Sequence, residues 1–228
     1  MVFPFVFDWT LLLLIPGIIV SIWAQSRITR AYNTYSKMAV MSGISGAETA
    51  QRILLANGLM DVRIAVSQGR LTDHYSPRKR TVNLSQRNYA SSSIAAVAVS
   101  AHEVGHAIQH KEGYFPRKVR NVLAPVVSAA SYMLWPILII GFLAEITGII
   151  TIAVYIFAAI FAFQLITLPV EFNASRRALA ALRSENVLAE EEVHGAKKML
   201  NAAALTYVAA TLVALLNVIR FASLARRR

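Results

Sequence analysis

Four long apolar runs dominate the hydropathy pattern of the chain. A hydrocarbon core about 30 Å thick needs about 20 apolar residues of helix to cross it, and each run approaches or exceeds that length. The last run is only 18 residues long, so a packed, non-spanning helix stays open as its alternative. The pattern predicts a mostly α integral membrane protein with about four transmembrane helices, in the runs Val2–Ala24, Val122–Ala144, Ile146–Val170 and Ala202–Ile219.

The first run has two interpretations, a cleaved signal peptide or an uncleaved membrane anchor. No basic segment precedes its apolar residues, and no A-x-A cleavage site follows them. These missing signals favour the uncleaved anchor.

The polar stretch that follows carries shorter periodic patterns. Residues Gly46–Gly58 have helical periodicity and end in glycine. Val62–Val66 alternates as a strand does, Gln68-Gly69 predicts a turn, and Arg80–Leu84 is expected to return as a second strand. Ser93–His110 has the apolar positions of a buried helix. We therefore expect a small α+β domain at one membrane face.

A single residue, Glu145, joins the second and third apolar runs, which predicts a tight transmembrane hairpin. Pro125 and Pro136 are expected to bend its first helix. Two more helices are predicted after the hairpin, at Phe172–Ser184 and Glu190–Met199. The predicted parts are an anchor (1–24), a polar region (25–121), the hairpin (122–170), a helical segment (171–201) and a C-terminal helix with a basic tail (202–228).

Composition and charge narrow the class of protein. Hydrophobic residues make up 56% of the chain, too many for an ordinary soluble domain. The lack of cysteine excludes disulfides and thiolate zinc sites. The net charge is +11, and residues 24–121 hold 14 Lys and Arg against 5 Asp and Glu. Because short cytoplasmic loops are basic in membrane proteins, this excess predicts a multi-pass protein of the cell membrane with a cytoplasmic polar region, and no nucleic-acid binding.

The helix predicted at Ser93–His110 contains the sequence HEVGH. His102 and His106 are four residues apart, so they project from one helix face and can bind one Zn²⁺. Glu103 can then take a proton from water at the metal. Ser91, Ser92 and Ser93 are candidate N-caps, and Gly105 lacks a β-carbon, so another element can pack closely behind the metal. The alternative is a buried helix with two surface histidines.

Zinc in enzymes usually has a third protein ligand, for which the chain offers several groups. We favour Glu171, because it follows the hairpin and begins a predicted helix, whose N-terminal dipole favours a carboxylate. His110 would lie a further turn along, and we interpret it as a helix-end cation. The other candidates are His74, Glu112 and His194.

Several motifs in order resemble the YugP-type family of bacterial membrane zinc metallopeptidases and, more distantly, HtpX-type membrane proteases. They are LTDHYSP, SIAAVAVSAHEVGHAIQHKEGY, TLPVEFNAS and MLNAAALTYVAA. The resemblance implies that His102, His106 and Glu171 bind zinc and that Glu103 is the catalytic base. Asn173 stands where the family usually has Asp, which argues against a charged role at that position. Ser175, on the same helix face as Glu171, is a candidate hydrogen-bond partner for a ligand histidine, or a small residue for packing.

The pattern and the resemblance together predict a membrane-integral, zinc-dependent endopeptidase that acts on peptides or membrane proteins and has the lipid bilayer as a partner, with a role in membrane protein quality control. Residues 25–121 are then its zinc-protease region, and residues 171–201 carry the third ligand. His74 or Tyr75 is the candidate donor to the developing oxyanion, with a purely structural turn as the alternative. The predicted strands offer an edge for an extended substrate. Two other functions stay open. One is a catalytically silent membrane scaffold with structural zinc, which would need a fourth protein ligand. The other is a metal transporter, which would need ionisable residues within its membrane spans.

Overall fold

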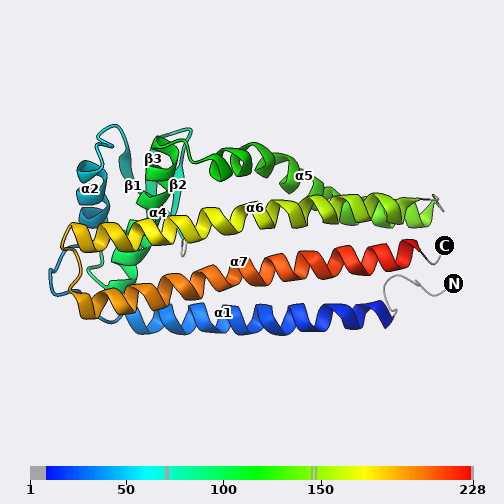
Figure 1. Cartoon of the computed structure of the whole chain (residues 1–228), viewed down its shortest axis with the longest axis horizontal. Helices are drawn as coiled ribbons and strands as arrows, with labels where there is room; N and C mark the ends of the chain where they lie inside the picture. The colour runs from blue at the N-terminus through cyan, green and yellow to red at the C-terminus, as the bar shows by residue number, and fades with distance from the viewer. Residues whose placement is uncertain (1–8, 70–71, 145, 147, 227–228) are drawn as a thin grey trace. The chain divides into compact units, whose positions relative to one another are not determined.

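The computed structural model describes residues 9–69, 72–144, 146 and 148–226 (Figure 1). The start of the first apolar run (2–8), Leu71, Glu145 and the end of the basic tail (227–228) lie outside these residues. The described chain is mostly helical, as predicted. Its elements are η1 (Trp9–Leu14), α1 (Ile15–Tyr35), α2 (Gly46–Ala56), β1 (Arg63–Ser67), β2 (His74–Ser76), β3 (Thr81–Ser85), α3 (Gln86–Ala90), α4 (Ile94–Lys111), α5 (Phe115–Leu143), α6 (Ile149–Ser184) and α7 (Glu190–Ala225).

The chain divides into two compact units, and the longest helices run from one into the other. The helical unit comprises Met1–Gln25, Val119–Leu168 and Leu205–Arg228. The mixed unit, which holds the sheet, comprises Ser26–Lys118 and Pro169–Ala204. Each unit is described by itself below.

Four helices of the described chain are long and apolar enough to cross a membrane, and the helical unit contains their apolar parts. They are Trp9–Tyr35, Phe115–Gly141, Ile149–Ser184 and Glu190–Ala225. Large apolar side chains such as Ile22 and Tyr132 remain 65% and 83% exposed on them, as expected of surfaces that face lipid. The predicted membrane fold class is therefore confirmed.

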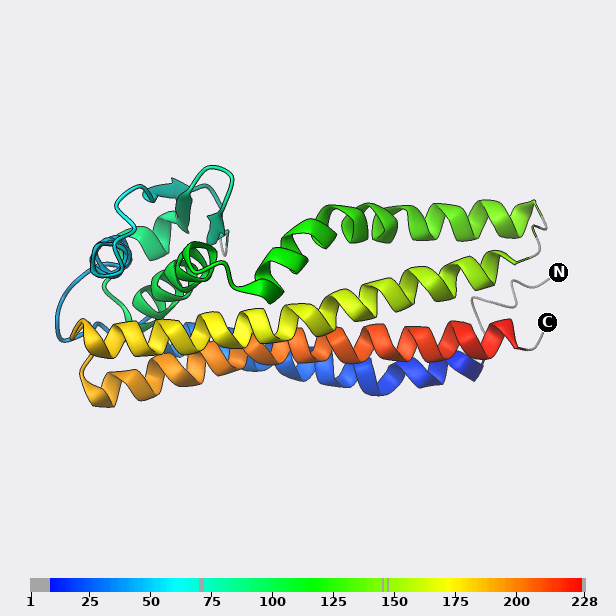
Figure 2. The same cartoon turned by 45° about the horizontal axis from the view of Figure 1, so that its top comes forward.

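Contacts inside the helical unit join helices that are distant in sequence. The rings of Phe157 and Phe221 stack with their centroids 4.7 Å apart. The last apolar run extends past its predicted end and includes Arg220, which is buried and donates from Nε to Thr10 Oγ1 at 3.3 Å. The run is part of one continuous helix, α7, and not a short separate one. The helix α5 contains Pro125 and Pro136 and is visibly bent in Figure 2.

The sheet of the mixed unit has the strand order β1-β3-β2, with β1 parallel and β2 antiparallel to β3. The predicted second strand does lie beside the first, but it runs parallel to it and does not return as in a hairpin. The intervening chain forms the short strand β2, and a turn with Arg80 at φ 47° brings β3 between the other two strands. Because β3 is central, the open edges of the sheet belong to β1 and β2.

Helix α4 is the core of the mixed unit and packs against α2, α3, β2 and β3. Its alanines and valines are buried around most of the helix, as in a helix enclosed on all sides. The predicted N-cap is confirmed, since Ser93 Oγ accepts a hydrogen bond from the Ala96 amide. The chain leaves the helix through Gly113, whose φ of +65° favours glycine.

The prediction that a new helix begins at Glu171 or Phe172 is wrong. The helix α6 runs without interruption from Ile149 to Ser184 and contains Pro169. Proline removes one backbone donor, but long apolar helices tolerate it where neighbouring groups compensate. Glu171 therefore lies inside a helix, and a helix N-terminus does not orient its carboxylate.

Candidate metal centre

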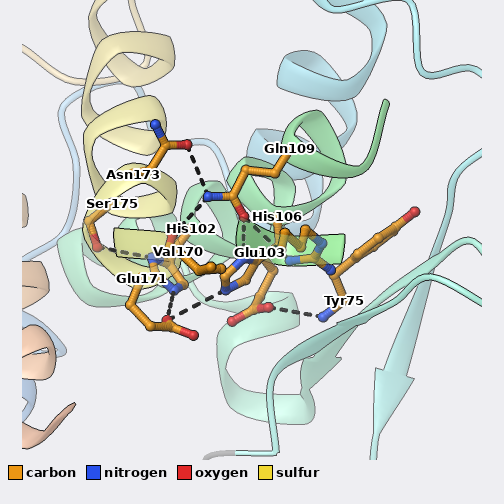
Figure 3. A network of polar contacts seen from close by, with 10 residues as sticks. Tyr75, His102, Glu103, His106, Gln109, Val170, Glu171, Asn173 and Ser175 are labelled. Carbon is orange, nitrogen blue, oxygen red and sulfur yellow. Dashed lines mark hydrogen bonds and ion pairs between the residues drawn. The ribbon is translucent and has the colours of Figure 1, made fainter. Parts of the chain in front are cut away.

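Three side chains from α4 and α6 converge in the mixed unit (Figure 3). His102 and His106 lie one turn apart on α4, and their rings meet edge to face with centroids 4.8 Å apart. The Oε2 atom of Glu171 is 3.3 Å from His102 Nε2 and 3.6 Å from His106 Nε2. Among the described residues, these three are the group of histidine and acidic side chains whose ligand atoms lie close enough together to hold a metal ion.

The donor chemistry of the cluster fits zinc. Each histidine uses Nδ1 elsewhere, since His102 Nδ1 is 3.2 Å from Ser175 Oγ and His106 Nδ1 is 3.0 Å from Gln109 Oε1. Both Nε2 atoms therefore face the buried Glu171 carboxylate. Two imidazole nitrogens and one carboxylate oxygen form a common ligand set of catalytic zinc, which leaves a position for water or substrate.

Burial and charge act in opposite directions on His102. Burial alone would lower its pKa, but the hydrogen bond with Glu171 and the charge of Glu103 raise the pKa overall. The two carboxylates therefore stabilise positive charge at this position, whether it comes from a proton or from a metal ion.

The carboxylate of Glu103 lies beside the histidine rings and is 8% exposed. Its Oε2 atom accepts a hydrogen bond from the Tyr75 backbone amide on the edge strand β2, at 2.9 Å. This hydrogen bond holds Glu103 against the edge strand β2. A carboxylate held beside the metal cluster in this way has the position that a proton acceptor requires.

Close approach of α6 to α4 depends on a glycine. A Cβ atom added to Gly105 would lie 2.6 Å from the Ala174 carbonyl oxygen, closer than real contacts allow. The expectation that another element packs against this glycine is therefore confirmed, and that element is α6. Ala174 lies between Glu171 and Ser175 on the helix, so the contact sets the distance between the ligand helices.

The side chains of His74 and Tyr75 have partners outside the cluster of His102, His106 and Glu171. His74 is exposed, with Nδ1 2.8 Å from the Thr72 carbonyl and Nε2 3.2 Å from Asn83 Nδ2. The Tyr75 hydroxyl is 2.9 Å from His110 Nδ1, and Arg117 lies over the Tyr75 ring. Burial raises the pKa of Tyr75, although Arg80 and Arg117 oppose the shift. An oxyanion role for either residue stays a prediction.

The other candidate ligands lie apart from the cluster. Burial, together with the charges of Arg117 and Arg80, lowers the pKa of His110, and its role as a helix-end cation stays a prediction. Glu112 forms a two-pronged ion pair with Arg177, at 2.8 and 2.6 Å, which lowers the pKa of Glu112. His194 is exposed on α7.

Sequence reasoning missed Gln109, which is fully buried and contacts His106. Its signal was its position three residues after His106, on the same helix face. Asn173, where a charged role was doubted, accepts hydrogen bonds at Oδ1 from both Gln109 Nε2 and Arg177 Nε, at 2.9 and 2.7 Å. A neutral amide supplies that oxygen as a carboxylate would.

Comparison with known proteins supports the resemblance seen in the motifs. Residues 10–226 match the model of a family described as putative neutral zinc metallopeptidase. The relative named putative membrane protease YugP, from Bacillus subtilis (strain 168), is 47% identical over 201 residues, which cover 88% of this chain and 89% of the relative. No solved structure matches the chain. The predicted family is confirmed, and the match includes α4, α6 and all four apolar helices.

Proposed function

Because the chain belongs to the family of putative neutral zinc metallopeptidases, we propose that it is a membrane-integral endopeptidase whose zinc ligands are His102, His106 and Glu171. The convergence of these three side chains carries the proposal, since they lie on two helices and far apart in sequence. Glu103, adjacent to the first ligand and held by the edge strand, is the general base. The residue types, their spacing and their burial together support peptide hydrolysis.

In the proposed reaction the chain's own residues hold the ion and move the proton. A zinc ion bound by the cluster would polarise the scissile carbonyl and make water a better nucleophile. Glu103 accepts the proton as water attacks, and the same carboxylate passes that proton to the leaving amine. The burial of Glu103 and Glu171 strengthens these charge interactions relative to bulk water.

The substrate is proposed to bind as an extended strand along β2. This strand is an edge of the sheet, and its Tyr75 amide already donates to the catalytic carboxylate. An edge strand offers unpaired backbone groups to an added chain. This replaces the earlier expectation of an edge at Arg80–Leu84, because that segment is the central strand.

The Glu103→Gln variant tests the proposed base. The amide keeps the shape of the side chain but cannot accept the proton, so peptide hydrolysis should fall at least about a hundredfold while zinc binding persists. Hydrolysis is measured on a quenched fluorescent peptide, and zinc by metal analysis of the same purified protein. Near-normal turnover by this variant would exclude Glu103 as the base, and a zinc-loaded parent without hydrolysis would favour a scaffold.

The zinc centre is proposed to face the cytoplasm, with peptides or membrane proteins as substrates and membrane protein quality control as the role. The support is the basic excess of residues 24–121 together with the apolar helices. The natural chain has no cysteine, so single cysteines at Ser67 and Ser184 can report the orientation. Both should resist an impermeant thiol reagent added to intact cells, and ready labelling of both would reverse the assignment.

A further inference from the structure

Gln109 has a side-chain amide with hydrogen-bond partners at both ends. Its Nε2 atom donates to the Val170 carbonyl at 2.8 Å and to Asn173 Oδ1 at 2.9 Å, both on α6. Its Oε1 atom lies 3.0 Å from His106 Nδ1 and 3.4 Å from Arg117 Nη1. The residue therefore lies between the α6 backbone and a histidine of the metal cluster (Figure 3).

The chemistry of these partners fixes which end of the amide faces the histidine. A backbone carbonyl only accepts hydrogen bonds, so the Gln109 atom that faces Val170 O must be the NH₂ group. The guanidinium of Arg177 only donates, so the Asn173 atom that faces it must be the carbonyl oxygen, which then also accepts from Gln109. A flipped Gln109 amide would place oxygen against two acceptors. The carbonyl oxygen of Gln109 is thereby held toward His106.

A carbonyl oxygen beside His106 Nδ1 requires that nitrogen to carry the proton. Neutral imidazole has one protonated nitrogen, so Nε2 then presents its lone pair to the centre shared with His102 and Glu171. We propose that Gln109 is a positioning residue that holds His106 in the tautomer and ring orientation needed for zinc. This inference rests on the proposed function, because it takes the cluster to be the zinc site.

The network that holds Gln109 continues to the protein surface. Asn173 is bound by Arg177, and Arg177 is paired in turn with Glu112. Asn173 is 8% exposed, whereas Glu112 is exposed. The buried amide of Gln109 is thus oriented from the α6 side, by the helix that also carries Glu171. The position of Glu171 and the orientation of His106 are coupled through one helix.

Two substitutions at Gln109 separate positioning of His106 from simple bonding between helices. Gln109→Met has similar length but offers no acceptor, and zinc affinity should fall about 10–100-fold, the usual effect of losing such a partner. Gln109→Glu restores an oxygen for His106 but loses both donors to α6. Positioning therefore predicts that the Glu variant recovers most of the lost affinity. A purely structural bond predicts that the two variants are equally weak.

Zinc affinity is measured on the full-length protein in detergent, by competition with a chromophoric chelator. The double variant Gln109→Met with Asn173→Asp adds a negative charge to the same network but provides no acceptor for His106. It should stay as weak as Gln109→Met. Recovery of affinity in this double variant would show that charge, and not the hydrogen bond to His106, explains the Glu result, and it would overturn the inference.

Parent and His102→Ala proteins separate this inference from the proposed function. The parent should bind zinc much more tightly than His102→Ala. If both bind equally, the cluster is not the zinc site and both proposals fail. If the parent alone binds tightly and Gln109→Met matches it, only the positioning role of Gln109 fails. Melting curves of the zinc-free proteins verify that each variant is folded.

Discussion

The two helices that bring the metal cluster together, α4 and α6, are held in different ways. Helix α4 is capped at its start, buried by α2, α3 and two strands, and carries both histidines and Glu103. Helix α6 is 36 residues long, and only its part from Pro169 onward belongs to the mixed unit. The backbone that carries the histidine pair is thus fixed by local structure, whereas Glu171 is placed by contacts between helices. Three substitutions that disturb the contacts between α4 and α6 should have effects of decreasing size.

Loss of the ligand from α6 should have the largest effect. Glu171→Ala removes the only carboxylate of the described cluster. Loss of a residue that only hydrogen-bonds a metal ligand lowers metal affinity by up to roughly 100-fold, and loss of Glu171 should lower zinc affinity by more than that. Hydrolysis should disappear with the metal. Zinc competition and peptide cleavage measure the two losses. The matched control is His194→Ala, an exposed histidine that should leave both nearly unchanged. Tight zinc binding by Glu171→Ala, with loss in His74→Ala instead, would require three histidine ligands.

Separation of the two helices should have an intermediate effect. Gly105→Ala places a methyl group against the Ala174 backbone, so α6 must shift, and the protein should lose about 1–3 kcal/mol of stability. Zinc should also bind more weakly, because Glu171 moves with α6. Chemical unfolding and zinc competition measure the change. Gly195→Ala is the control, since its methyl group meets the Tyr35 side chain and not the backbone of another helix. Equal stability of the two variants would contradict the role of the close contact.

Loss of the partner of His102 should have the smallest effect. Ser175→Ala removes the oxygen 3.2 Å from His102 Nδ1 but leaves all three ligands and the helix contact. Zinc affinity should fall about tenfold, the low end for such partners, because the hydrogen bond is neutral and longer than that of Gln109. A Ser175→Thr variant keeps a hydroxyl and should retain more affinity than Ser175→Ala. Equal affinity of Ser175→Ala and the parent would assign this serine to packing.

The same contrast explains how much the sequence could predict. The motif in α4, its N-cap and its glycine are local signals, and each was found where the pattern placed it. Glu171 was chosen from several candidates, but one of the two reasons was wrong, because α6 continues through Pro169 and Glu171 and no helix begins there. A single proline in an apolar helix does not show from sequence alone whether the helix ends there or continues.

The direction of β3 and the burial of Gln109 could not be predicted from local sequence patterns. The strand β2 has three residues, too few for an alternation to register, and its omission reversed the expected direction of β3 relative to β1. Gln109 is polar and fully buried, and the burial of its NH₂ group is explained by the hydrogen bonds that it donates to α6. Such partners are 61 and 64 residues away, so periodicity within α4 cannot reveal them. The apolar helices, by contrast, follow from length and composition alone.

In the proposed function, α4 and α6 share one zinc ion on which peptide hydrolysis depends. To test this, the purified full-length protein is stripped with a chelator and zinc is titrated back while hydrolysis is recorded. The rate should rise with bound zinc and saturate at one ion per chain, and Glu103→Gln should take up the same ion without hydrolysis. Full hydrolysis by the stripped protein, or equal zinc uptake by a variant lacking both His102 and Glu171, would contradict it.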